Sequence, residues 1–260
     1  MIHSVIVASD IHFGAEHGQA VDTFLAFALG LKPRPALMVL AGDIVDLSAL
    51  SRYDPTSDTP ANVVPEIQCA VRWTNRLAAR SPVTILSGNH EDRWAKALLG
   101  TKAIALRGAL GLTLRDQFLA QGMKRDVRWV DERPGVPGLM IGDRALLARH
   151  GHVQAGRYSN AKSIPDKLLR QTPTVSTIVG HHHRGGFLAN TVLGQTIFGI
   201  ANPHLSGDHD YCPNANWQRG FSLLEFYGAS RLRDCRKFTP HVLIMDERGS
   251  FCYGGKQYGK

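Results

Sequence analysis

The stretch that decides the fold covers residues 39–46 and reads Val39-Leu40-Ala41-Gly42-Asp43-Ile44-Val45-Asp46. An apolar run that starts at Ala36 stops at Gly42, and this pattern predicts a buried strand that gives way to a loop. Two carboxylates, Asp43 and Asp46, follow in that loop. Because ligands bind outside the carboxyl ends of strands in open α/β sheets, both are candidate site residues. Taken alone, the stretch is also explained by a simple Gly-Asp turn with a helix-capping aspartate.

Four other predicted strands, at residues 5–8, 83–86, 145–148 and 175–179, also run into polar clusters. These clusters are Asp10-Ile11-His12, Gly88-Asn89-His90-Glu91, His150-Gly151-His152 and Gly180-His181-His182-His183. Each has an ordinary explanation, namely a helix cap with a surface histidine, a turn, or an exposed polar loop. Asp10 and His12 are two residues apart, so in an extended chain both side chains face the same way. Because five clusters follow five apolar strands, we expect them to meet at one site.

The rest of the chain alternates between helices and strands. Apolar spacing and capping predict helices over residues 20–31, 63–79, 92–99 and 163–170, and further strands at 127–130, 138–141, 196–200, 221–226 and 242–245. Residues 51–60 and 202–217 are predicted loops, and residues 103–121 are interpreted as a helical cap over the site. No repeat or linker interrupts the pattern, so we predict an α/β fold and one domain over residues 1–260.

Composition limits the class of protein. Hydrophobic residues make up 43% of the chain, and no apolar run approaches the ~18 residues of a membrane span. The first residues lack the basic region and cleavage site of a signal peptide, so we expect a cytoplasmic protein with no membrane partner. The four cysteines lack Cys-x-x-Cys spacing, which favours reduced thiols. The net charge of +8 is explained either by solubility or by an anionic partner.

The clusters offer both oxygen and nitrogen atoms to a metal. The candidate ligands are Asp10, Asp43 and Asn89 through oxygen, and His12, His150, His181 and His183 through nitrogen. Such a mixed set suits Mn, Fe, Zn, Co or Ni, and it argues against the all-oxygen cages of Ca and Mg. Asp43 has two carboxylate oxygens, so it could bridge two ions.

Together the clusters resemble the calcineurin-like metallophosphoesterases. They stand in the family order as Asp10-x-His12, Gly42-Asp43-x-x-Asp46, Gly88-Asn89-His90-Glu91, His150-Gly151 and Gly180-His181-x-His183. The resemblance implies a four-layer α-β-β-α sandwich, in which two mixed sheets are flanked by helices. Further stretches are similar to the single-domain members found in phages and prophages: Leu50-Ser51-Arg52-Tyr53, Glu91-Asp92-Arg93, His183-Arg184-Gly185-Gly186 and Asn216-Trp217-Gln218-Arg219-Gly220-Phe221.

The resemblance also implies a role for each candidate residue. One divalent metal ion would bind Asp10, His12, Asp43 and His183, and a second would bind Asp43, Asn89, His150 and His181. Mn²⁺ is the favoured cofactor for both positions. His90 would be the catalytic residue that faces the leaving oxygen, and Asp46 would orient it. His152 and His182 would take no part, although the family's usual Gly-His-Thr-His is Gly-His-His-His in this chain.

The implied reaction is the hydrolysis of a phosphate ester. A hydroxide that bridges the two ions attacks phosphorus in line, while the ions take up the developing charge. Protonated His90 donates to the departing alkoxide. The alternatives are a non-catalytic binding protein on the same fold and a two-metal hydrolase that cleaves a non-phosphate bond.

Arginine and aromatic residues near the clusters bear on the substrate. Arg52, Arg93 and Arg184 are candidate substrate-binding residues, because arginine suits bidentate phosphate contacts. Aromatic side chains that could stack a base stand nearby, although each also suits an ordinary core or surface position: Tyr53, Trp94, Tyr158 and Trp217. We therefore expect an anionic phosphorylated substrate, and a phosphodiester of a nucleotide or nucleic acid ahead of a phosphomonoester. The oligomeric state is not predicted.

Overall fold

The computed structural model describes residues 1–52, 59–60, 62–99, 111–132, 135–136, 138–152, 163–208 and 215–259. Within these ranges the helices are α1 (Gly18–Gly30), α2 (Val64–Ala78), α3 (Glu91–Leu99), α4 (Leu114–Ala120) and α5 (Ser163–Gln171). The strands are β1 (His3–Ala8), β2 (Leu37–Ala41), β3 (Val83–Leu86), β4 (Arg128–Val130), β5 (Leu139–Ile141), β6 (Leu146–Arg149), β7 (Ser176–Val179), β8 (Gly186–Val192), β9 (Gln195–Ala201), β10 (Gly220–Tyr227), β11 (Lys237–Ile244), β12 (Phe251–Tyr253) and β13 (Lys256–Tyr258).

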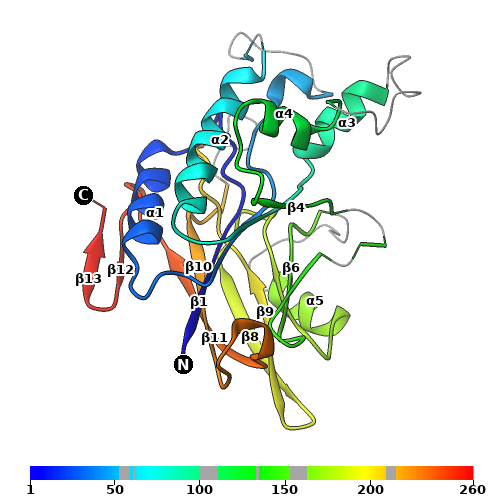
Figure 1. Ribbon diagram of the computed structural model, residues 1–260. Coiled ribbons are helices and arrows are strands. Elements are labelled where there is room, and N and C mark those ends of the chain that lie inside the picture. The colour runs from blue at the N-terminus through cyan, green and yellow to red at the C-terminus, as the bar shows by residue number, and fades with distance from the viewer. Residues whose placement is uncertain are drawn as a thin grey trace.

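The strands form two mixed sheets and a separate hairpin. The first sheet has the order β11-β10-β1-β2-β3-β4, in which β1 to β4 run parallel and β10 and β11 pair antiparallel. The second sheet has the order β5-β6-β7-β9-β8, with β6, β7 and β9 parallel and both edge strands antiparallel to their neighbours. Strands β12 and β13 form the hairpin, which lies beside α1 in Figure 1.

Alternation along the strands gives the first sheet an apolar core on each face. In β1, Ile6 and Ala8 belong to the core shared with α1 and α2, whereas Val5 and Val7 belong to the core between the two sheets. Successive side chains of a strand point to opposite faces, so a continuous apolar run serves both cores at once. This explains why the strands read as unbroken apolar segments in the sequence.

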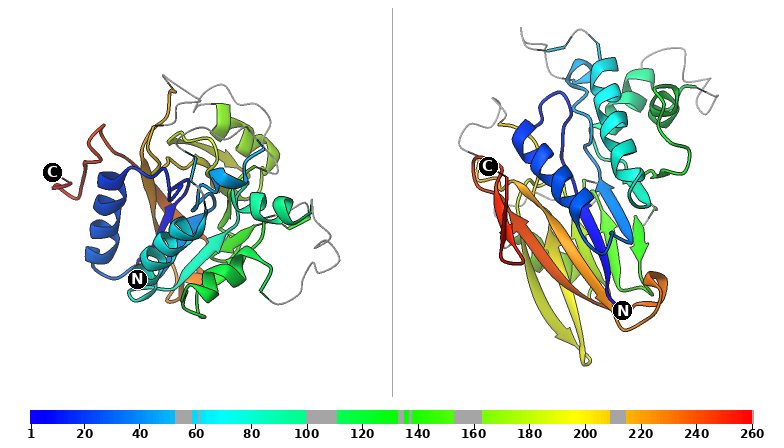
Figure 2. Two further views of the ribbon diagram at one scale, coloured as in Figure 1. Left: turned by 90° about the horizontal axis from the view of Figure 1, so that it is seen from above. Right: turned by 60° about the vertical axis from the view of Figure 1, so that its left-hand side comes forward.

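Helix α5 covers the outer face of the second sheet. Its Ile164 and Leu168 pack with Val179 of β7 and Ala201 of β9. Figure 1 shows α1 and α2 on one side of the strands and α5 on the other, and the view from above in Figure 2 shows the same separation. The layers are therefore helix, sheet, sheet and helix, which confirms the four-layer α/β sandwich predicted from the sequence.

Most predicted elements occur with small differences at their ends, but β11 begins at Lys237, well before the strand predicted at 242–245. Helix α1 begins at Gly18, because the His17 ring accepts the backbone N–H of Ala20 and caps the helix. Strand β8 and the hairpin β12–β13 were not predicted. Much of β8 is exposed at the sheet edge, so its sequence lacks the apolar alternation of a half-buried strand.

Some predicted segments lie partly or wholly outside the described residues. These include most of the loop at 51–60 and the first part of the segment at 103–121. The described part of the latter forms α4, which packs against α2 and α3. In the portion of the chain that the structure describes, no helix is both long and apolar enough to cross a membrane.

Gly199 of β9 provides a test of how closely α5 packs on the sheet. A Cβ atom at this position would meet the backbone carbonyl of Pro165 at the start of α5. We expect Gly199→Ala to lower the free energy of unfolding by about 1–3 kcal/mol, because α5 would have to move outward. Urea unfolding measures this change. Gly186→Ala in β8 is the matched control, since a Cβ there meets nothing within 4 Å, and equal stability of the two variants would contradict the packing.

Candidate metal centre

The loops after β1 and β2 stay paired beyond the ends of the strands. Asp10 donates its backbone N–H to the carbonyl oxygen of Gly42 at 3.0 Å, and His12 donates its own to that of Asp43 at 3.0 Å. Asp46 then donates back to the carbonyl oxygen of Phe13 at 3.1 Å. The first two sequence clusters are therefore held against each other by their own backbones.

Five candidate ligands adopt the left-handed backbone conformation, with φ between 51° and 65°: Asp10, His12, Asp43, His181 and His183. Aspartate and histidine tolerate this region better than most residues, yet each such residue costs roughly 1–3 kcal/mol, and strain of this kind gathers at functional sites. Asp10 and His12 face the site because of these turns. The two side chains thus share a site as expected, but the expected cause, an extended chain, is wrong, because both residues are left-handed.

Two glycines of the clusters allow side chains to approach the backbone closely. Gly42 has φ +86°, and a Cβ there would overlap the ring of His150. At Gly88 a Cβ would overlap both the side chain and the backbone nitrogen of Asp43. The Gly-Asp and Gly-Asn pairs are thus explained by crowding around Asp43 and His150.

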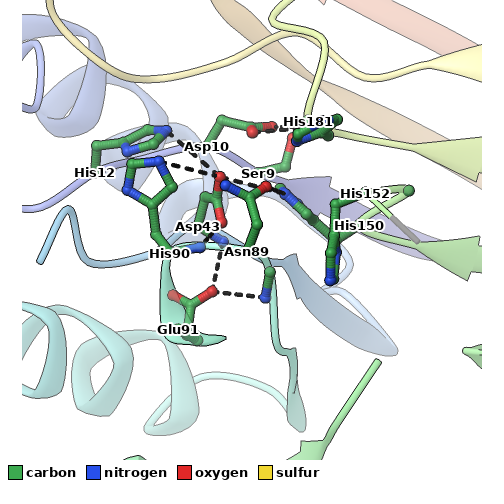
Figure 3. A network of polar contacts seen from close by, with 12 residues as sticks. Ser9, Asp10, His12, Asp43, Asn89, His90, Glu91, His150, His152 and His181 are labelled. Carbon is green, nitrogen blue, oxygen red and sulfur yellow. Dashed lines mark hydrogen bonds and ion pairs between the residues drawn. The ribbon is translucent and has the colours of Figure 1, made fainter. Parts of the chain in front are cut away.

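The carboxylate of Asp43 lies at the centre of the site (Figure 3). Its Oδ2 is 3.3 Å from Nε2 of His150, 3.8 Å from Nε2 of His90 and 3.9 Å from Nε2 of His12. Its Oδ1 accepts the backbone N–H of His90 at 2.9 Å. One buried carboxylate therefore faces imidazoles from three different loops.

Potential metal-donor atoms gather in two separate groups around this carboxylate and in a third group that overlaps the first. Within each group the atoms lie within 4.8 Å of one another: Asp10, His12 and His183 form the first group, Asp43, His150 and His181 the second, and His12, Asp46 and His90 the third. Asn89 adjoins the second group, because its Oδ1 is 3.1 Å from Nε2 of His150. The structure thus brings together every residue that the sequence predicts as a metal ligand.

Asp46 lies beside the first group and contacts two rings. Its Oδ1 is 3.1 Å from Nδ1 of His12 and 3.2 Å from Nδ1 of His90. The two rings also meet edge to face, with centroids 4.3 Å apart. Asp46 is therefore placed to orient His12 as well as His90, and the contact with His12 was not predicted.

Burial and neighbouring charges shift the pKa values at the centre. Burial alone would raise the pKa of Asp43, but His150 and His90 outweigh it and hold that pKa well below its usual range. Burial lowers the pKa of His150, yet Asp43 more than compensates and brings it to about 10. This spot therefore favours positive charge. Burial and the charge on His150 lower the pKa of His181 to about 3, so its neutral ring keeps a lone pair for a metal.

The residues present fit divalent metal ions. Asp10, Asp43 and Glu91 are all buried, and buried carboxylates require compensating positive charge. Nδ1 of His150 lies 2.8 Å from the carbonyl oxygen of Ala41. This oxygen can only accept, so Nδ1 carries a proton, and Nε2, which faces Asp43, is the ring atom that would bind a metal. Carboxylate, amide and imidazole donors of this kind suit a transition metal.

Comparison with known proteins agrees with this geometry. The profile of the calcineurin-like phosphoesterase family matches residues 3–198 of the chain, a range that contains all five clusters. The chain belongs to this family. Among solved structures, Pseudomonas putida nuclease MPE is similar, with 14% identity, 88% of this chain and 86% of that chain covered, and a TM-score of 0.35. No curated protein matches the chain.

Membership of the calcineurin-like phosphoesterases makes the protein a metal-dependent phosphoester hydrolase.

In this phosphoesterase, Glu91 at the start of α3 joins two loops. Its carboxylate accepts the backbone N–H groups of Gly88 at 2.6 Å, Asp43 at 2.8 Å and Ile44 at 2.8 Å. Burial and the charge of Asp43 raise the pKa of Glu91. The bonds it accepts hold the loops after β2 and β3 together.

Two further buried glutamates also accept backbone N–H groups of the loops at the site, and neither was predicted from the sequence. Glu132 accepts the backbone N–H groups of His150 and of Gly151, the latter at 3.0 Å. Glu66 of α2 accepts the N–H of Leu47 at 2.7 Å, directly after Asp46. Glu132 follows an apolar strand, as the recognised clusters do, and this signal could have found it. Glu66 stands on the buried face of an amphipathic helix, which is an unusual place for a carboxylate.

His204 was also missed, and it lies behind a candidate ligand. Its ring stacks on that of His183, with centroids 4.7 Å apart and an interplanar angle of 12°. Its Nδ1 is 2.7 Å from Oγ of Ser206. Burial lowers the pKa of His204 well below its usual range, so the ring is neutral. His204 therefore supports His183 through packing.

The remaining predicted residues lie at the edge of the centre or away from it. His152 pairs with Asp92 at 3.3 Å, and His182 lines a small pocket beside α5. Neither belongs to the two donor groups around Asp43. Arg52 is exposed and Arg184 is partly exposed. Tyr53 and Tyr158, which stand near the clusters in the sequence, lie outside the described residues.

The role of Glu91 can be tested by removing its charge. In Glu91→Gln an amide NH₂ would face backbone N–H donors, so we expect stability to fall by about 2 kcal/mol or more and Mn²⁺ affinity to fall with it. Urea unfolding and Mn²⁺ titration measure the two effects. Glu225→Gln is the matched control, because Glu225 pairs with His241 on β11, outside the metal centre. Wild-type Mn²⁺ affinity in Glu91→Gln would contradict the assignment.

Proposed function

We propose that this phosphoesterase binds two divalent metal ions and hydrolyses phosphodiesters of nucleotides or nucleic acids. One ion would bind Asp10, His12, Asp43 and His183, and the other would bind Asp43, Asn89, His150 and His181. The observation that carries the assignment is the position of Asp43, whose carboxylate faces imidazoles from both groups. Bound Mn²⁺, or another divalent transition metal, supplies charge that polarises phosphoryl oxygens and acidifies water.

His90 is the proposed proton donor to the leaving oxygen. Its Nδ1 lies 2.7 Å from the backbone carbonyl oxygen of Asp46, and this oxygen can only accept, so Nδ1 carries a proton. Nε2 is then the atom that faces the substrate. It lies 3.8 Å from Oδ2 of Asp43 and accepts a hydrogen bond from Nη2 of Arg93 at 2.9 Å, so this bond must break and Nε2 must take up a proton before it can donate to the leaving oxygen. Burial lowers the pKa of His90, but Asp43 and Asp46 outweigh burial and raise it. A raised pKa favours the protonated form that a general acid needs.

Arg93 is the predicted substrate-binding residue with the best-supported position. It lies three residues after His90 on α3, and its Nη2 is 2.9 Å from Nε2 of that ring. Its Nη1 donates to the carbonyl oxygen of Asp46 at 2.8 Å. These contacts fix a permanent positive charge beside the proposed proton donor, where a phosphate oxygen would meet it. We propose that Arg93 positions His90 and contacts the phosphate, with Arg52 and Arg184 at the rim.

The proton-donor role predicts a dependence on the leaving group. His90→Ala should retain its metal and lose ~10²–10⁴-fold in rate with alkyl esters, but far less with p-nitrophenyl esters, because a good leaving group needs little protonation. Values of kcat across esters of rising leaving-group pKa measure this, with His241→Ala on β11 as the control. Equal losses across the series would refute the role of His90.

The choice of a polyanionic substrate rests on charge. The chain has 30 Lys and Arg against 22 Asp and Glu, and several of the acidic residues are buried at or behind the metal centre: Asp10, Asp43, Glu66, Glu91 and Glu132. The outer surface is therefore more basic than the net charge of +8 suggests. A basic outer surface on a phosphoesterase favours nucleotides and nucleic acids over neutral or cationic partners.

We also propose that residues 1–260 act as one domain. In support, β1 near the start of the chain pairs with β10 near its end. The core between the sheets also draws on strands from both halves of the sequence. The similarity to phage and prophage members and the cytoplasmic location stay predictions.

A panel of phosphoesters assayed with added Mn²⁺ tests the proposed substrate class. We expect bis(p-nitrophenyl) phosphate to be cleaved in preference to p-nitrophenyl phosphate, and Asp43→Ala to cleave neither. Single-stranded nucleic acid should bind with a log-log salt slope of roughly −0.7 per phosphate contact. A preference for the monoester would instead favour a phosphomonoesterase. Binding of nucleic acid without hydrolysis of any ester would favour a non-catalytic binding protein.

A further inference from the structure

Trp217 lies at the edge of the metal centre, in the segment that leads into β10. Its indole centroid is 4.4 Å from that of His183 at an interplanar angle of 64°, and 5.7 Å from that of His204 at 72°. The indole is therefore packed against a candidate ligand of the first ion and against the ring that supports this ligand.

Backbone hydrogen bonds fix the segment that carries Trp217. The next residue, Gln218, donates its N–H to the carbonyl oxygen of His183 at 2.9 Å, and His204 donates its N–H to the carbonyl oxygen of Gln218 at 3.1 Å. The Gln218 side chain accepts the N–H of Gly185 at 3.1 Å. The indole is thus pre-positioned, and a rigid aromatic side chain loses little conformational entropy when a ligand binds.

The indole of Trp217 is partly exposed, whereas His183 and His204 behind it are buried. Trp73, by contrast, is buried in the core. Trp94 is partly exposed as Trp217 is, but it packs against that core and donates its indole N–H to the carbonyl oxygen of Leu112, away from the candidate ligands. A partly exposed aromatic side chain beside a phosphoester site is the kind of feature that stacks nucleic acid bases in other proteins.

A row of rings connects Trp217 to the proposed proton donor. His90 lies 4.3 Å from His12, His12 lies 5.3 Å from His183, and His183 lies 4.4 Å from Trp217, all between ring centroids. The indole therefore flanks the centre on the side of the first donor group.

We propose that Trp217 is a stacking platform for the base of a nucleotide whose phosphate lies at the metal centre. This inference rests on the proposed function and narrows its substrate to esters with a planar base next to the phosphate. Every base has a π face, so the platform selects for the presence of a base without choosing among bases. Trp217 is thereby a specificity residue, separate from the candidate metal ligands.

Adenosine 5′-monophosphate and ribose 5-phosphate form a matched pair that differs only in the base. Calorimetric titration of the Mn²⁺-loaded protein should show the nucleotide binding roughly 10- to 100-fold more tightly. Trp217→Ala should remove most of this preference while it keeps the affinity for ribose 5-phosphate and the Mn²⁺ content. Trp217→Phe should keep part of the preference, and Trp94→Phe, the control, should keep all of it.

Equal affinity of the wild type for the two ligands would overturn the proposal. Equal weakening of both ligands in Trp217→Ala, or loss of Mn²⁺ in that variant, would show that Trp217 only supports His183. The measurement does not require hydrolysis. Base-dependent binding through Trp217 in a protein that cleaves no phosphoester would contradict the proposed function alone, whereas diester cleavage with no base preference would contradict the platform alone.

Discussion

The hydrogen bonds accepted by the buried carboxylate of Glu91 are the interaction on which the rest of the site depends. Strands β2 and β3 end side by side, and their loops then need partners for backbone N–H groups that the sheet no longer satisfies. Glu91 supplies them, accepting from Gly88 of one loop and from Asp43 and Ile44 of the other. Asp43 is thereby held in its left-handed conformation, with its own carboxylate directed at the imidazoles.

The same kind of interaction recurs at the other loops. Glu132 accepts from the loop after β6, and both side-chain oxygens of Asp10 accept the backbone N–H of His181 after β7, each at 3.0 Å. Each loop is thus fixed by a carboxylate from another element, so the donor atoms converge without further rearrangement. The arrangement also concentrates negative charge in a buried place, which favours divalent cations and, through them, a phosphorylated substrate.

The layers of the fold could be predicted from the resemblance to the calcineurin-like metallophosphoesterases. The residues that meet around Asp43 could be predicted because apolar strands that end in Gly, Asp and His leave a local pattern. The sequence was not sufficient for residues whose importance comes from contacts distant in the chain. Glu132 acts on His150 and is marked only by the apolar strand that precedes it, whereas His204 acts on His183 with no motif to mark it. The left-handed turns at Asp10 and His12 could not be predicted from the sequence either, because backbone pairing with the next loop determines them.

The central claim is that Asp43 joins two groups of donor atoms into one binuclear centre. Titration of metal-depleted protein with Mn²⁺, followed by elemental analysis and electron paramagnetic resonance, tests it most directly. The account predicts two ions per chain with a spin-coupled signal, and the loss of both ions in Asp43→Ala. A single ion per chain after saturation, or two uncoupled ions that persist in Asp43→Ala, would contradict it.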